Sequence, residues 1–199
     1  MNEKNNLGMV RKPSSAVEKA APGTKRILSG MVADTLALTK EIAEPELWFQ
    51  NGKKYQRGIG VTQNCAEAVK WFRLAAERGH AKAQICLGVC FKWGLGLQRD
   101  HNEAINWFRR AAEQGDANGQ FNLGWMYQHL WGEMKDESQA FKWYLEAAKK
   151  GHPDAQFFVG LCYSVGSGVP EDKTKGDEWE RKARDNGYPN TGTVKGYDF

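Results

Sequence analysis

Residues 81–116 read AKAQICLGVCFKWGLGLQRDHNEAINWFRRAAEQGD. In the first half of this stretch, Ala83, Leu87 and Phe91 fall on one stripe at helical spacing. In the second half, NEAINWFRRAAEQ repeats that spacing, with Trp107 among its apolar positions. The stretch therefore predicts two amphipathic helices.

The residues between and after the two segments predict where these helices begin and end. Gly94 and Gly96 break the first helix and allow a positive φ in the connection. Asp100 stands at the N-cap position of the second helix, and Gly115 stands just after its end. The stretch is thus predicted to be one helical hairpin.

The same pattern recurs along the chain with a period of 36 residues and no insertions. The repeated columns include Trp71, Trp107, Trp143 and Trp179, and also Gly52, Gly88, Gly124 and Gly160. Four repeats follow, over 45–80, 81–116, 117–152 and 153–188. Because a single hairpin cannot bury its own apolar face, the prediction is an all-α solenoid, a right-handed α/α superhelix of stacked hairpins.

The repeat resembles the Sel-1-like repeat family, which is related to the tetratricopeptide repeats. The resemblance rests on the pattern AxAQxxLGxxYxxGxGVxxDxxxAxxWFxxAAxxGH, and it covers roughly residues 45–188. It implies a superhelical adaptor for protein interaction rather than an enzyme.

The ends of the chain differ from the repeats. Residues 1–25 are predicted to be a disordered basic arm, and residues 26–43 an amphipathic helix. This helix occupies the place of a second helix from a missing repeat, so it is either a cap on the array or a detachable docking element. Residues 189–199 form a short glycine-rich tail.

Composition excludes several classes of protein. Residues 1–43 hold 7 Lys and Arg against 4 Asp and Glu, whereas residues 44–199 hold 21 against 20, so no nucleic-acid partner is expected. No apolar run has the length of a signal peptide or a transmembrane segment. The four cysteines have irregular spacing, which favours reduced thiols and a cytoplasmic location.

The sequence predicts no catalytic residue, metal or cofactor. His80 and His152 occupy one repeat column two repeats apart, so the repeat alone accounts for them. Cys86 and Cys90 lack further ligands at metal-binding spacing. Some members of the resembled family are discussed as β-lactam-binding enzymes, but this chain has neither an SxxK nor a KTG motif.

The candidate binding site is a groove lined by the first helices of the hairpins, which face the concave side in this superfamily. Its predicted lining combines a basic lip with an apolar and aromatic floor: Lys53, Arg57, Val89, Trp93, Trp125, His129 and Leu161. Aromatic anchors of this kind commonly carry binding energy. The alternative is that these side chains pack between neighbouring repeats.

A second candidate is the connection HLWGEMKDE, residues 129–137, which departs from its equivalents in the other repeats. Leu130 replaces a glycine, Glu133 replaces an aliphatic residue, and Trp131 is large for a loop. These residues indicate either a local repacking or a binding edge.

Together these features predict a monomeric, non-enzymatic adaptor that binds a protein or peptide. Two alternatives remain: a small-ligand-binding protein or hydrolase of the β-lactam-binding type, and a structural tether whose basic arm is the active part.

Overall fold

The computed structural model describes residues 44–129 and 135–189, which form α-helices joined by short connections and contain no strand. A helix over residues 44–57 comes first. It is followed by α2 (Cys65–Glu77), α3 (Ala81–Trp93), α4 (His101–Glu113), α5 (Ala117–His129), α6 (Glu137–Lys149), α7 (Pro153–Val165) and α8 (Lys173–Asp185). The predicted arm 1–25, the predicted helix 26–43 and most of the tail 189–199 lie outside the described residues.

The second helix of each hairpin begins at a capping side chain. Asp100 Oδ1 accepts hydrogen bonds from the backbone N–H groups of Asn102 and Glu103 at 2.9 and 3.1 Å, which confirms the predicted N-cap. Asn64, Asp136 and Asp172 cap their helices in the same way. One polar residue per repeat therefore sets the start of each second helix.

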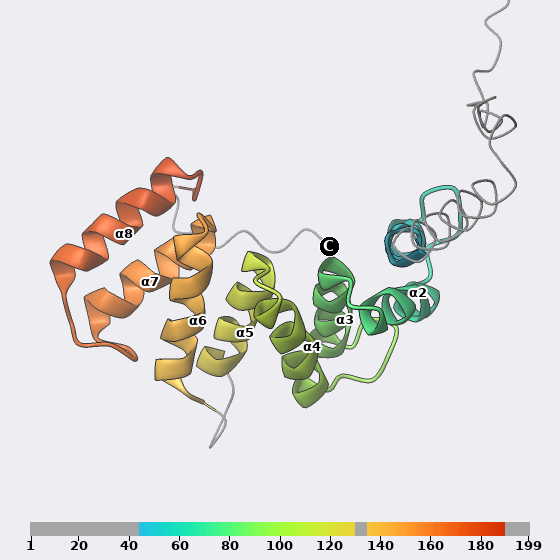
Figure 1. Ribbon diagram of the computed structural model, residues 1–199, viewed down its shortest axis with the longest axis horizontal. Helices are drawn as coiled ribbons and strands as arrows, with labels where there is room; N and C mark the ends of the chain where they lie inside the picture. Colours follow the sequence, from blue (N-terminus) through green and yellow to red (C-terminus); the bar gives the residue numbers. More distant parts are fainter. Residues whose placement is uncertain (1–43, 130–134, 190–199) are drawn as a thin grey trace, which may run out of the picture. The chain divides into compact units, whose positions relative to one another are not determined.

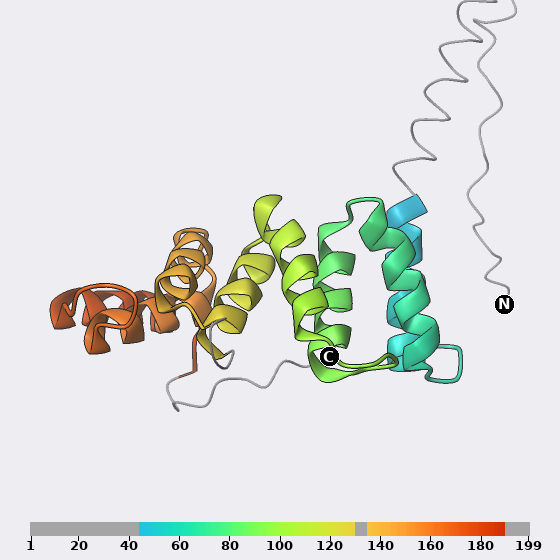
Figure 2. The same ribbon diagram turned by 90° about the horizontal axis from the view of Figure 1, so that it is seen from below.

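Successive helices pack against one another in chain order, as Figures 1 and 2 show for α2 to α8. Phe72, Phe108 and Tyr144 occupy one repeat column and are fully buried between the two helices of their hairpins. Each contacts a glycine of the facing first helix, where an added Cβ would overlap the aromatic ring, as at Gly88 beside Phe108. The result is an all-α solenoid of helical hairpins, as the sequence predicts.

Buried glutamines connect consecutive hairpins. The side-chain amides of Gln84, Gln120 and Gln156 donate hydrogen bonds to the backbone oxygens of Ala76, Ala112 and Ala148, at 3.1, 3.3 and 3.1 Å respectively. Those oxygens belong to the last turns of the preceding second helices, where each accepts a backbone hydrogen bond from residue i+3 instead of i+4. Each junction between repeats thus gains a specific polar contact inside an apolar core.

In the second and fourth repeats, the second glycine of the connection lies against the preceding repeat. Gly96 has φ +73° and lies so close to the backbone carbonyl of Cys65 that an added Cβ would overlap it. Gly168, with φ +70°, lies in the same way against Glu137, whereas Gly60 has nothing within 4 Å. The connections of the second and fourth repeats therefore contact the start of the second helix in the repeat before them.

Candidate functional site

The predicted groove residues are exposed to different extents. Trp93 is 51% exposed, Leu161 is 36% exposed, and Arg57 and His129 are also exposed. Lys53 and Trp125 are half-buried. Val89 is buried in the core, because α3 is covered by neighbouring helices on more than one side. We name the exposed and half-buried positions the first-helix face: Lys53, Arg57, Trp93, Trp125, His129 and Leu161.

The first-helix face carries positive charge and lacks negative charge at its centre. Neither α3 nor α5 contains an aspartate or a glutamate. Burial raises the pKa of the Cys86 thiol on α3, and the charges of Lys53 and Arg57 act in the opposite direction. These two cations therefore lie close enough to influence α3, one repeat further along.

The most distinctive feature of this face is a cluster of two tryptophans around a lysine that the sequence analysis did not single out. The ammonium of Lys92 on α3 lies 3.2 Å from the ring centroid of Trp125 on α5 and 5.0 Å from that of Trp93. The imidazole of His129 stacks on Trp125, with ring centroids 4.1 Å apart and an interplanar angle of 12°. We name these four residues the Trp–Lys cluster.

Lys92 is a buried cation without a counter-charge among the residues that the structure describes. It is 4% exposed, and no hydrogen bond or ion pair joins its ammonium to any residue of 44–129 or 135–189. Burial lowers the pKa of Lys92 from 10.5 to about 8. The faces of the two tryptophans provide its main electrostatic stabilisation.

His129 reports the same positive environment. Burial lowers the pKa of its imidazole, and the charges of Lys92 and Lys135 act in the same direction. Its Nδ1 lies 3.0 Å from the backbone oxygen of Trp125, which fixes the ring against the indole. The cluster is therefore an ordered cationic and aromatic surface rather than a set of loose side chains.

Comparison of the four repeats shows that Lys92 is unusual at its position. In the other three repeats this column contains uncharged residues, namely Gln56, Gln128 and Ser164. A lysine in a column that is otherwise uncharged is unusual, but its burial depends on Trp125, which belongs to the following repeat. Comparison of columns alone could have identified the position, although not its contacts.

His80 and His152 act as helix caps, which explains why they share a repeat column. Their Nδ1 atoms lie 3.1 and 3.3 Å from the backbone nitrogens of Ala83 and Ala155, from which they accept hydrogen bonds. Their rings stack on Phe49 and Phe121 with centroids 4.8 Å apart in both cases. These contacts account for both histidines without a catalytic role.

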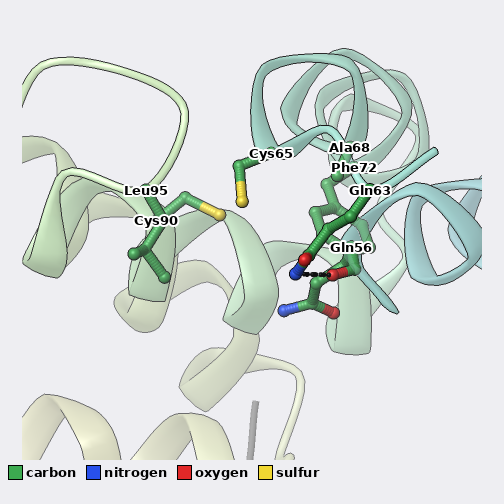
Figure 3. Close-up of a pocket in the computed structure, with 7 residues that line it drawn as sticks. All are labelled: Gln56, Gln63, Cys65, Ala68, Phe72, Cys90 and Leu95. Atoms are coloured by element: carbon green, nitrogen blue, oxygen red, sulfur yellow. Dashed lines mark hydrogen bonds between the residues drawn. The ribbon is translucent and has the colours of Figure 1, made fainter. Parts of the chain in front are cut away.

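A cavity of about 210 Å³ lies between the first two repeats. Figure 3 shows its lining, with the sulfurs of Cys65 and Cys90 directed toward one another: Gln56, Gln63, Cys65, Ala68, Phe72, Cys90 and Leu95. Burial raises the pKa of Cys90 to about 12, which keeps this thiol protonated and weakly reactive. The cavity is smaller than typical small-molecule sites, which begin at about 300 Å³.

Three further features bear on the candidate site. Leu130, Trp131 and Glu133 lie outside the described residues, so the binding edge predicted there stays a prediction. Within residues 44–129 and 135–189, no cluster of His, Cys, Asp and Glu could hold a metal ion. In the same ranges, no helix has the length and apolarity that crossing a membrane requires.

Stacked helical hairpins with an apolar and basic face define an α-solenoid repeat protein. The Sel1 repeat model matches residues 52–80, 81–116, 117–152 and 153–188. The chain therefore belongs to the Sel1 repeat family. Proteins of this family are generally non-catalytic scaffolds for protein interaction.

Solved structures agree with this assignment. The chain is 38% identical to a Sel1 repeat protein from Oxalobacter formigenes, with a TM-score of 0.68 over 72% of this chain and 57% of that one. It is 33% identical to c5321, a protective antigen of uropathogenic Escherichia coli strains with an SLR fold. That match has a TM-score of 0.71 and covers 77% of this chain and 33% of the antigen. No curated protein sequence matches the chain.

The chain thus spans about half the length of one of these relatives and a third of the other.

Proposed function

We propose that the chain is a non-enzymatic adaptor that binds a segment of a partner protein along the first-helix face. The observation that carries this proposal is the exposure of Trp93 on α3 and of Leu161 and Val165 on α7, at 51%, 36% and 62%, with the ammonium of Lys92 beside Trp93. Large exposed apolar side chains grouped on one face are typical of interaction surfaces. Tryptophan is also prominent among residues that dominate binding energy.

The small-ligand alternative has weaker support in the described residues. The cavity between the first two repeats is small, and the buried thiol that lines it is not activated. The first-helix face, by contrast, extends across several repeats, which suits a polypeptide rather than a compact ligand.

Loss of the Trp93 side chain is expected to weaken partner binding about 30-fold or more. The measurement captures partners with the tagged chain, identifies them by mass spectrometry, and titrates the purified partner against Trp93→Ala. The double variant Lys53→Glu/Arg57→Glu is expected to slow association, because it reverses charge at one end of the face.

Leu74→Ala is the matched control, since Leu74 is 44% exposed but lies on α2, a second helix. It is expected to change affinity less than about threefold, as a residue outside the interface would. Partner affinity that is unchanged in both Trp93→Ala and the charge-reversal variant, with helicity intact, would eliminate the first-helix face as the binding surface.

A further inference from the structure

Lys92 is less exposed to solvent than the other lysines that lie near aromatic rings in the described residues. Lys142 lies 5.9 Å from the ring of Trp143, Lys175 lies 5.7 Å from that of Tyr163, and Lys182 lies 4.3 Å from that of Trp179, but all three lysines are exposed to solvent. Water therefore solvates their charge. Lys92 is 4% exposed, so its charge has lost most of that solvation.

A largely buried ammonium favours a compensating acceptor, because water solvates its charge less than at the surface. Among the described residues the ammonium of Lys92 lies near the rings of Trp93 and Trp125 and forms no hydrogen bond or ion pair with an oxygen atom. The ring quadrupole of tryptophan offsets only part of the desolvation cost. The ammonium of Lys92 can therefore donate hydrogen bonds to an anion that binds at the cluster.

We infer that the Trp–Lys cluster is a recognition site for a carboxylate side chain, an aspartate or glutamate, in an extended segment of the partner protein. The carboxylate would accept hydrogen bonds from Lys92, while a neighbouring apolar residue of the segment would contact the exposed face of Trp93. This inference rests on the proposed function and names the chemistry of the partner.

Charge and geometry favour a single carboxylate over other anions. One ammonium balances one carboxylate charge, whereas a phosphate commonly binds to several donors or to the planar fork of arginine. No aspartate or glutamate on α3 or α5 competes for Lys92. The nearby charges are those of Lys135, which forms an ion pair with Glu137 at 2.8 Å, and of His129 when protonated, so Lys92, unpaired among the described residues, is the cation that attracts an acidic segment.

A protein segment is also favoured over a nucleic acid. Residues 44–199 carry almost equal numbers of basic and acidic residues, so the array lacks the broad positive surface that phosphate backbones require. Around the Trp–Lys cluster the positive charge comes from a few side chains, among them Lys92 and Lys135. An acidic peptide matches a local site of this size.

The test uses the full chain and two phage-displayed libraries of nine-residue peptides, one with glutamate and one with glutamine fixed at the central position. Peptides selected from the glutamate library are synthesised in both forms and titrated by quenching of tryptophan fluorescence. The protein variants are Lys92→Met, which removes the charge, and Lys142→Met, which removes an exposed lysine beside a tryptophan.

For the unaltered chain and for Lys142→Met, the glutamate peptide is expected to bind about 10-fold to 100-fold more tightly than the glutamine peptide. For Lys92→Met, the two peptides are expected to bind within about threefold of each other. This four-way comparison isolates the pairing of Lys92 with the carboxylate from any general change in the surface.

Other outcomes would overturn the inference in distinguishable ways. If the glutamate peptide loses the same affinity on replacement by the glutamine peptide in the unaltered chain and in Lys92→Met, Lys92 is excluded as the carboxylate partner. The adaptor function would remain intact. Failure of every peptide and every purified partner to bind would overturn both proposals. Lys92-dependent binding of a 12-nucleotide single strand, without peptide binding, would identify a nucleic acid instead.

Two controls exclude this protein itself as the source of the carboxylate. A dimer in sedimentation equilibrium that Lys92→Met converts to monomer would identify a second copy of the chain as the occupant. Glutamate peptides that bind Glu133→Gln more tightly than the unaltered chain would identify this chain's own loop as a competitor. Either result would overturn assignment of the site to a partner.

Discussion

Gly96→Ala is expected to lower the free energy of unfolding by about 3–5 kcal/mol, a large effect for the addition of one methyl group. The positive φ of +73° accounts for about 1–2 kcal/mol of this loss. The remainder arises because the new Cβ would overlap the backbone carbonyl of Cys65, which cannot move without displacing the start of α2. Urea unfolding followed by circular dichroism measures the change.

Gly60→Ala is the matched control, since Gly60 has φ +71° and nothing within 4 Å of an added Cβ. It is expected to cost only the conformational part, about 1–2 kcal/mol. Gly168→Ala should behave like Gly96→Ala, because it meets the backbone of Glu137. Equal losses at Gly60 and Gly96 would contradict a role for the contact between consecutive repeats.

Lys92→Met is expected to raise the stability of the protein at pH 7 by about 1–3 kcal/mol, because it replaces a desolvated charge with an apolar side chain of similar length. Loss of the contact between the ammonium and Trp125 offsets part of the gain. A stabilising substitution that abolishes binding of an acidic peptide would show that the charge is maintained at the expense of stability.

The pH dependence of unfolding tests the same cause independently. The pKa of Lys92 is about 8 in the folded chain and 10.5 as the ordinary value, so between these values the unfolded chain binds more protons. The free energy of unfolding therefore rises as the pH passes upward through 8, by about 1 kcal/mol from pH 7 to pH 9. This gain in stability is lost again as the pH falls through 8. Lys92→Met should lack this rise.

The buried thiols make the free energy of unfolding decrease as the pH rises, but at higher pH than the effect of Lys92. Burial raises the pKa of Cys90 to about 12 and that of Cys162 to about 11. Their contribution to stability is complete below pH 9 and decreases as the pH rises toward these values. The difference between the parent chain and Lys92→Met cancels this shared contribution. Parallel pH profiles for the two proteins would contradict a depressed pKa at Lys92.

Much of the fold could be predicted from the sequence because the repeat presents each local signal several times. Asp100 is a capping residue in one hairpin, and Asp136 and Asp172 repeat the signal at the same position. Gly94 and Gly96 have positive φ, as the predicted connection requires. These features depend on residues close in the chain, where local sequence determines the backbone.

The candidate site was less accessible to prediction because its contacts join different repeats. The assignment of Val89 to an open groove assumed that one side of each first helix faces solvent. In α3, buried positions occur nearly all round the helix, from Ala83 to Lys92. Lys92 was overlooked for the same reason, since its aromatic neighbour Trp125 lies in the following repeat.

The contacts of Gly96 and Gln84 all run in one direction along the array, from a later repeat to the one before it. In both cases a residue of a later repeat approaches a backbone carbonyl of the repeat before it, and Gly168 and Gln156 do the same further along. During synthesis, each hairpin leaves the ribosome after the surface that receives it is already available. The repeats can therefore fold in chain order, because a folded hairpin already presents the backbone carbonyls that the next hairpin contacts.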